Sequence, residues 1–320
     1  MTMADVGCAG ILVADTFCGP MASLPRAGEL LAIAAMPSKA GGCAANVAID
    51  LAKQGFDIDV AGCLGKDGAA GVVTSALAGH GIGCGHIVRV ESKPTSTTVI
   101  LLVAGEDRRY IHTFGANAAF TVAHIDRDWA AKLKVFYLGG LLAMPGIRIE
   151  ELCELLAWCR GHGVVTVVDV VAPRESSNVE LGQLLPHVDY FTPNDDEAGQ
   201  LTGMTDPIEQ LQAFAALGAH TVIITCGAAG AIAGKDGKFW RSEIYDMKSV
   251  DPSGSGDAFT SGIITGILRG WDLETTLPYA TALGGSATLA IGTTDSVFTA
   301  DQAAAFVASH PMRMVTGNYA

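Results

Sequence analysis

The sequence predicts an α/β fold built on a mainly parallel central sheet, and two observations support this prediction. The first is a set of apolar runs typical of buried strands, at 135–138, 164–168, 188–191 and 221–225. Helical patterns alternate with these runs, at 149–162, 179–185, 195–202 and 208–217. Strands separated by helices form right-handed βαβ units with parallel strands. The second is composition: of 320 residues 49% are hydrophobic and 17% charged, enough for the core of one large domain.

The first eighty residues begin the same pattern. An apolar run at 6–14 ends at Asp15 and predicts a buried strand whose tip carries a carboxylate. Residues 16–39 contain three prolines, which favours a loop with an edge strand at 29–36 rather than core. A helix follows from about 40 to 54, with Gly55 as its stop signal. A strand at 57–64 and a helix from 68 to 80 come next.

Two further segments depart from the strand–helix alternation. Residues 97–103 and 109–114 are strand-like and are joined by a turn at 105–107. Together with the edge strand they predict a small sheet outside the main domain. Near the C-terminus we expect a hairpin and two closing helices, at 230–234 with 238–241, at 258–268 and at 273–291.

Charge and cysteine usage exclude several classes of protein. The net charge of −13 argues against a nucleic-acid-binding protein, which needs a basic face. Eight scattered cysteines, with no CxxC pair and no zinc-like spacing, fit a reducing compartment. The apolar runs are shorter than the roughly 20 residues that span a bilayer, and no signal peptide is evident. We therefore expect a cytoplasmic protein without a membrane segment.

The stretch 249–259 turns a glycine-rich loop directly into a helix. Small residues allow close approach to a ligand, and the helix start adds partial positive charge, so the stretch suits an anion. Asp257 would repel that anion unless the carboxylate acts as a general base for a hydroxyl that attacks a phosphate. The alternative is that Asp257 only caps the helix. Asp15, Asn194 and Thr225 also follow predicted strands, so all of these groups are expected at one rim of the sheet.

Four motifs together resemble those of the ribokinase-like (PfkB) carbohydrate kinase family. In family order they are GGCAANVA at 41–48, NDDE at 194–197, TCGAAG at 225–230 and DPSGSGD at 251–257. The resemblance covers nearly the whole chain. It implies a ribokinase-like three-layer α/β/α sandwich with a mainly parallel central sheet and a small β-sheet lid. It further implies a single kinase domain over 1–320, with lid segments at approximately 16–39 and 95–115.

The resemblance implies an ATP-dependent sugar kinase and a role for each matching residue. Asp257 would be the general base, with an anion hole formed by Gly254, Ser255 and Gly256. The sugar would be bound by Asp15, Gly41, Gly42, Asn46 and Asn117. The nucleotide would be bound by Asn194, Thr225, Gly227 and Gly230. Glu197 would hold Mg²⁺ through water, and a monovalent cation, K⁺, would be bound by Asp251, Ser253 and the loop 291–296.

Some features depart from the family pattern or leave alternatives open. Pro252 and Ser255 stand where the family often has Thr and Ala, which puts activation by K⁺ in question. The family often pairs through its lid, which implies a homodimer. A nucleoside kinase on the same scaffold and a non-catalytic sugar sensor remain alternatives, whereas a dinucleotide-binding loop is excluded by the spacing. Arg108, Arg109 and His112 are expected on a solvated lid face, and Lys39 as a flanking surface charge.

Overall fold

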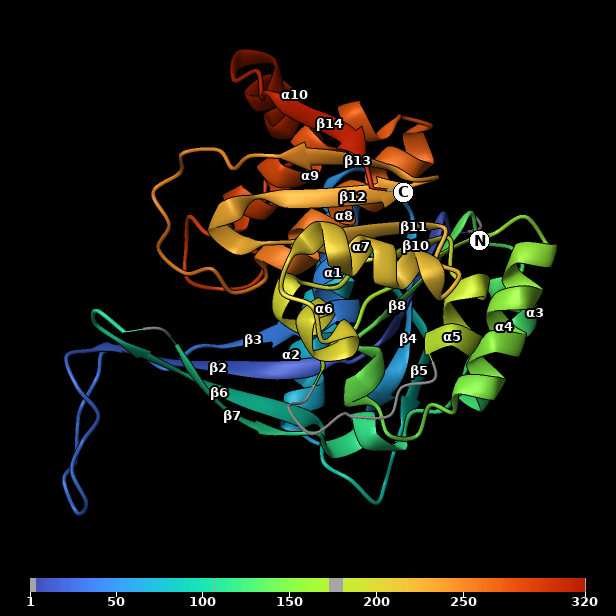
Figure 1. Ribbon diagram of the computed structural model, residues 1–320. Coiled ribbons are helices and arrows are strands. Elements are labelled where there is room, and N and C mark those ends of the chain that lie inside the picture. Colours follow the sequence, from blue (N-terminus) through green and yellow to red (C-terminus); the bar gives the residue numbers. More distant parts are fainter. Residues whose placement is uncertain (1–3, 107, 173–180, 320) are drawn as a thin grey trace.

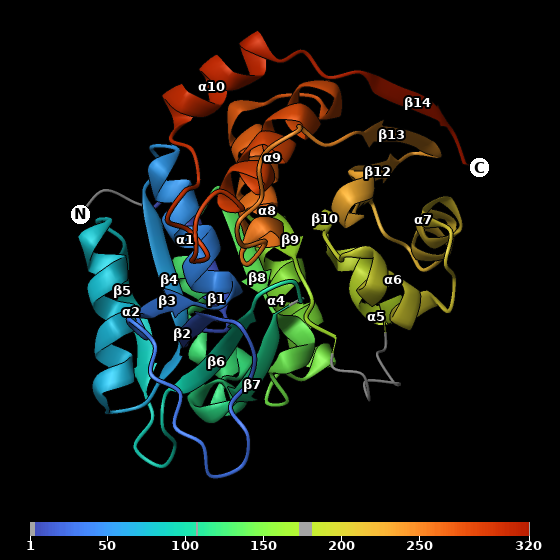
Figure 2. The same ribbon diagram turned by 90° about the vertical axis from the view of Figure 1, so that its left-hand side faces the viewer.

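The computed structural model describes residues 4–106, 108–172 and 181–319 and contains two sheets (Figures 1 and 2). The ten strands of the large sheet, in spatial order, are β14 (Met314–Asn318), β13 (Lys238–Ser242), β12 (Ala231–Lys235), β11 (Thr221–Thr225), β10 (Tyr190–Phe191), β9 (Val165–Val168), β8 (Val135–Gly139), β1 (Val6–Gly10), β4 (Ile58–Leu64) and β5 (Gly83–Arg89). Strands from β11 to β5 run parallel, as their helical connections require. Strands β12 to β14 complete the sheet in antiparallel order.

Helices cover both faces of the large sheet. One layer consists of α1 (Cys43–Lys53), α2 (Gly68–Gly79), α8 (Ser255–Arg269) and α9 (Leu273–Ala287). The other consists of α4 (Ile149–Gly161), α5 (Leu181–Leu184), α6 (Asp195–Thr202) and α7 (Pro207–Ala216). Figure 2 shows α1, α8 and α9 on one side of the sheet and α5, α6 and α7 on the other. Successive side chains of a strand point to opposite faces of the sheet. In β8, Val135 and Tyr137 pack against the layer that contains α1, and Phe136 and Leu138 pack against the opposite layer.

A smaller sheet extends away from this sandwich (Figure 1). Its order is β3 (Ser38–Gly41), β2 (Val13–Met21), β6 (Ser96–Val103) and β7 (Arg109–Thr113). The predicted three-layer α/β/α fold with a small lid sheet is thus confirmed. The predicted strand at 29–36 is wrong, because this mostly exposed segment pairs with no strand and β3 begins only after Pro37.

The predicted strand at 6–14 is two strands in different sheets. Strand β1 ends at Gly10, whose backbone has a φ of 138°, and β2 then enters the lid sheet at Val13. A side chain at Gly10 would overlap the carbonyl of Gly139 on the neighbouring strand. Glycine therefore allows the chain to leave one sheet and join the other within three residues.

Several elements differ from the predictions at their ends or were not predicted. The helix predicted at 273–291 ends at Ala287. No element was predicted for β5, β14, α3 (Arg127–Ala130) or α10 (Ala300–Ser309), which are short or lie at sheet edges. The helix predicted at 179–185 falls partly outside the described residues; its described part is α5 with a following 3₁₀ turn. The 3₁₀ helices are η1 (Gly115–Ala119), η2 (Val122–His124), η3 (Leu141–Ala143), η4 (Leu185–His187) and η5 (Gly227–Ala229). Within the described ranges, the helices are all too short or too polar to cross a membrane.

Candidate active site

The start of α8 forms the centre of the candidate site. Gly254 precedes the helix with a φ of 78°, and a Cβ there would lie 2.7 Å from the Cα of Thr293. Only glycine fits both the conformation and this approach to the neighbouring loop. The Ser255 N–H donates to the Pro252 carbonyl at 3.3 Å. Because the first N–H groups of a helix lack intrahelical partners, those of Gly256 and Asp257 could donate to an anion at this end of α8.

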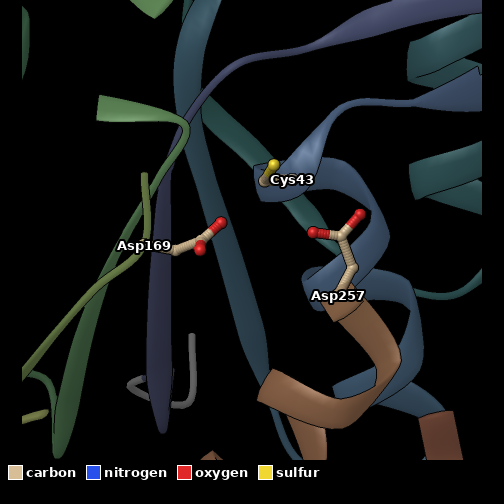
Figure 3. A group of neighbouring side chains, drawn as sticks. All are labelled: Cys43, Asp169 and Asp257. Atoms are coloured by element: carbon tan, nitrogen blue, oxygen red, sulfur yellow. The ribbon is translucent and has the colours of Figure 1, made fainter. Parts of the chain in front are cut away.

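Asp257 follows Gly256 in the first turn of α8 and contacts helix α1. Its Oδ2 accepts a hydrogen bond from Asn46 Nδ2 at 2.7 Å. Figure 3 shows Cys43, Asp169 and Asp257 pointing toward one another, and one polar atom of each lies within 4.8 Å of the others. Burial raises the pKa of Asp257, and hydrogen bonds from Asn46 and Cys43 partly oppose this rise. A carboxylate with a raised pKa accepts a proton more readily, as a general base must.

Two further carboxylates lie near Asp257. Burial raises the pKa of Asp169 well above its usual range, and the charges of Glu197 and Asp257 add to the rise. Burial likewise raises the pKa of Glu197 to about 7, with contributions from Asp257 and Asp196. Half-buried carboxylates that repel one another are a suitable donor set for a hard divalent cation. The oxygen donors of these carboxylates are of the kind that Mg²⁺ prefers, and they include Glu197, which the resemblance assigns to Mg²⁺ through water.

Sequence reasoning did not select Asp169 or Cys43 as site residues. Asp169 directly follows the strand predicted at 164–168, so the rule that pointed to Asp15 would also have found it. Cys43 was quoted within the 41–48 motif and was given no role. Its thiol is buried, and burial, followed by the charge of Asp257, raises its pKa. The thiol therefore acts as a hydrogen-bond donor to the carboxylates rather than as a nucleophile.

Asn194 and Glu197 form a reciprocal cap at the start of α6. The Asn194 Oδ1 accepts from the Glu197 N–H at 2.8 Å, and the Glu197 carboxylate accepts from the Asn194 N–H at 3.0 Å. Asn194 also pairs with Thr225 at the end of β11 in an isolated β-bridge. The cap fixes the Glu197 carboxylate on the rim, beside the end of the strand that leads into the predicted nucleotide loop.

The predicted acceptor residues meet where β2, β3 and α1 converge. Asp15 is 7% exposed, and burial raises its pKa to about 6, with Asp257 adding to the rise and the Thr98 hydroxyl opposing it. A side chain at Gly41 would overlap the Asp15 carboxylate, and one at Gly42 would lie 2.6 Å from the Ile11 carbonyl. The glycine pair therefore makes room for Asp15 and for close approach of a ligand to the backbone.

Asn46 and Asn117 occupy different positions with respect to this region. Asn46 lies between Asp257 and the Thr293 hydroxyl, which donates to Asn46 Oδ1 at 2.8 Å. Asn117 makes two hydrogen bonds to the backbone of Leu12, at 3.1 and 3.0 Å, between β1 and β2. The structure thus ties the Asn117 amide to the backbone where the chain changes sheets.

The charged lid residues separate by role. Arg109 pairs with Glu106 on the exposed lid edge, as expected for a solvated face. His112 Nδ1 lies 3.0 Å from the Thr98 hydroxyl, which also supports Asp15. Arg108 reaches back toward the main domain, where its Nη1 lies 3.8 Å from Asp251 Oδ1. The expectation of a solvated face therefore fails for Arg108.

A cavity of about 380 Å³ opens beside the start of α8. Its lining includes residues predicted for the nucleotide or the anion hole: Thr225, Gly227, Gly230, Ser255 and Gly256. It also includes residues the sequence did not indicate, among them Tyr245, Met247 and Phe259. The Tyr245 hydroxyl is buried, and within the described part of the chain it has no hydrogen-bond partner. The cavity therefore combines an apolar wall with an unsatisfied polar group.

Asp251 and Ser253, the residues predicted to bind a monovalent cation, lie in the turn just before α8 and are 2% and 5% exposed. The Asp251 Oδ1 accepts from the Ser253 N–H at 3.0 Å and from the Ser253 hydroxyl at 2.7 Å. The other oxygen, Oδ2, accepts from the Gly292 N–H at 3.2 Å. Asp251 thus links the turn before α8 to the loop at 291–296.

Comparison with known proteins identifies the family of this chain. The family described as pfkB family carbohydrate kinase matches residues 3–300. The chain belongs to this family. The pfkB-family chain is 25% identical to the ribokinase of Haemophilus influenzae over 272 residues, covering 83% of this chain and 87% of that protein. It is 29% identical to the fructoselysine 6-kinase of Shigella flexneri over 248 residues, covering 76% and 86%.

The fold of this pfkB-family chain is also similar to solved structures. A putative ribokinase II from E. coli, determined in complex with ATP and Mg²⁺, superimposes with a TM-score of 0.82 at 19% identity. The match covers 96% of this chain and 100% of that one. Family membership makes this protein an ATP-dependent carbohydrate kinase, which confirms the predicted enzyme class.

Proposed function

We propose that this kinase transfers the γ-phosphoryl group of ATP to a hydroxyl of a small sugar, with Asp257 as general base. The main support is the position of Asp257. It contacts Asn46 on the acceptor side and lies in the first turn of α8, whose first two residues, Ser255 and Gly256, line the 380 Å³ cavity. A group placed between two substrates can accept the proton that the attacking hydroxyl loses.

The proposed step forms one bond and breaks one bond. Asp257 removes the proton of the sugar hydroxyl while that oxygen forms a bond to the γ-phosphorus. The bond from the γ-phosphorus to the bridging oxygen breaks, and ADP leaves with the electron pair. Backbone N–H groups of the Gly254–Gly256 turn and of Asp257 stabilise the charge on the transferred group. Because the Ser255 N–H already donates to Pro252, the neighbouring N–H groups contribute most.

We assign the sugar to the region where Asp15, the Gly41–Gly42 pair and Asn46 lie together. A carboxylate and an amide can bind neighbouring hydroxyls, and the glycines let the ring approach the backbone. Glu197 and Asp169 would hold Mg²⁺ through water beside the nucleotide phosphates, and this ion would neutralise phosphate charge during transfer. Thr225, Gly227 and Gly230 would contact the nucleotide, and Asn194 would position Glu197.

We further propose that the protein acts in the cytoplasm as a homodimer paired through the lid. The support for the dimer is that β7 is an edge strand with exposed apolar side chains: Tyr110 is 52% exposed and Ile111 is 64% exposed. An exposed apolar edge strand favours association with another chain. Sedimentation of the wild type against Ile111→Glu tests this, and an unchanged monomer in both would contradict it.

The mechanism is tested by Asp257→Asn. We expect turnover to fall by roughly 10²–10⁴-fold, because the amide cannot accept the proton. Calorimetry should show unchanged ATP binding, which separates lost chemistry from lost folding. Turnover within threefold of wild type would refute the role of Asp257.

The acceptor class is tested by ATP turnover over a panel of sugars and nucleosides. Preferred use of a small sugar supports the proposal. Preferred use of a nucleoside would replace it with a nucleoside kinase. Sugar binding without turnover by any acceptor would indicate a non-catalytic sensor.

A further inference from the structure

The loop at 291–296 supports the anion hole directly. A Cβ at Gly254 would lie 2.7 Å from Thr293 Cα, so the two backbones are in close contact. Thr293 also donates to Asn46, which in turn binds Asp257. The position of this loop therefore determines the geometry of both the anion hole and the general base.

The family resemblance implies that a monovalent cation fixes this loop, but the donor set here does not fit one. Both Asp251 oxygens accept hydrogen bonds from protein donors, Ser253 and Gly292. The Arg108 guanidinium adds a positive charge 3.8 Å from Asp251 Oδ1. The carboxylate that would neutralise the ion is thus already neutralised by the protein.

The resemblance implies that the other ligands of such an ion come from the 291–296 loop, and Lys39 already binds a carbonyl of this loop. Its ammonium donates to the Ile291 carbonyl at 2.9 Å and pairs with Asp295 Oδ1 at 2.9 Å. The ammonium lies so near the turn that a Cβ at Gly292 would be 2.8 Å from Nζ. A K⁺ ion bound to the same carbonyl would face a like charge at close range.

A second ammonium holds the far side of the loop. Lys53, on α1, donates to the Thr294 carbonyl and, at 3.5 Å, to the Val297 carbonyl. Asp50, one helical turn earlier, is fully buried, and its charge interacts with that of Lys53. Two lysines from different elements therefore bind carbonyl oxygens along the 291–297 segment, which is the task of a coordinated monovalent ion.

We propose that Lys39 takes the place of an activating monovalent cation, so that this kinase reaches full activity without K⁺. Lys39 is a positioning residue: its ammonium holds the 291–296 loop against Gly254 and does not touch either substrate. The role of Lys39 rests on the proposed kinase function only in the test that measures turnover. It corrects the expectation that Lys39 is merely a flanking surface charge.

The first test measures turnover in buffers whose only other cation is choline, with KCl or NaCl exchanged for choline chloride at constant ionic strength. We expect wild-type kcat to change less than twofold. Lys39→Met should lose at least tenfold in choline and recover most of that loss on addition of K⁺ or NH₄⁺, which can enter the vacated position. A wild type that needs K⁺ for a tenfold gain, or a Lys39→Met variant equal to wild type in choline, would overturn the proposal.

The second test does not depend on turnover. We expect K⁺ to raise the melting temperature of Lys39→Met and to leave that of the wild type unchanged. Lys66→Met is the matched control, since Lys66 pairs with Glu91 on the surface and should show neither effect. A wild type stabilised by K⁺ as strongly as Lys39→Met would contradict the inference. If no acceptor is phosphorylated, the proposed function fails, while the melting comparison still decides the role of Lys39.

Discussion

Two groups of carboxylates lie near the N-terminus of α8, and their charges are neutralised in different ways. The divalent cluster is defined as Asp169, Glu197 and Asp257, three half-buried acids. Their pKa values are raised by partial burial and, for Asp169 and Glu197, also by neighbouring carboxylates. The second group is the lysine-bound loop, defined as residues 291–297 together with Asp251. Lys39 and Lys53 bind backbone carbonyls of this loop. The Asp251 carboxylate accepts hydrogen bonds from Ser253 and Gly292 and lies close to the Arg108 guanidinium.

This difference separates a task that needs an external ion from one that the protein performs itself. Phosphoryl transfer needs a cation that neutralises phosphate charge, and such a cation would be bound together with the nucleotide. The divalent cluster therefore remains electrostatically unsatisfied in the free protein. The loop beneath the anion hole only has to be held in place, and a side-chain ammonium can do that permanently. The predictions below test this division.

The largest effect is expected where the two groups meet, at Gly254. Gly254→Ala forces a left-handed conformation that costs about 1–3 kcal/mol on a non-glycine residue, and its methyl group would displace Thr293. We expect turnover to fall roughly 10²–10³-fold, because the anion-hole donors move. Differential scanning calorimetry should show a lower melting temperature.

Gly256→Ala is the stability control for that comparison. A Cβ at Gly256 meets nothing within 4 Å, so its melting temperature should equal that of the wild type. If Gly254→Ala has the melting temperature and turnover rate of the wild type, the contact between Gly254 and the 291–296 loop does not contribute to activity.

A smaller effect is expected in the divalent cluster. In the metal-free protein, burial and the neighbouring carboxylates make the ionised form of Asp169 unfavourable. Asp169→Asn removes this charge, so the metal-free variant should melt at a higher temperature than the wild type. The Mg²⁺ concentration for half-maximal turnover should rise about 10–100-fold. Asp196→Asn, which changes an exposed carboxylate on α6, should shift neither quantity strongly. Lower stability together with unchanged Mg²⁺ dependence would contradict the assignment of Asp169.

The same cluster predicts a dependence on pH. The folded pKa of Glu197, about 7, lies above its ordinary value of 4.5, so its contribution to metal-free stability is present below 4.5 and is lost as pH rises through 7. Mg²⁺ binding requires the ionised carboxylate and changes in the opposite direction. Below pH 7, apparent affinity for Mg²⁺ should fall by about tenfold per unit. Calorimetric titration at pH 5.5, 6.5 and 7.5 measures this, and Glu197→Gln should flatten the profile; equal profiles would remove Glu197 from the metal site.

The sequence predicted the sandwich and most of the rim because those features depend on local patterns. Buried strands have continuous apolar runs, and the glycine-rich turn before Asp257 has a short-range signature. The roles of Lys39 and Arg108 could not be predicted, because each depends on a partner far along the chain: Ile291 for the first and Asp251 for the second. The boundary between β1 and β2 was missed for a related reason, since it depends on packing of Gly10 against Gly139.

The smallest expected effect concerns Cys43, the neutral member of the site. Its thiol hydrogen-bonds to the carboxylates of Asp257 and Asp169, which partly opposes the rise in their pKa values caused by burial. Cys43→Ala removes this donor, so the lower limb of the pH–rate profile should move to higher pH while kcat at pH 8 falls less than about threefold. Cys43→Ser restores a donor and should return the limb toward its wild-type position. An unchanged limb in both variants would show that Asn46 alone sets the proton affinity of Asp257.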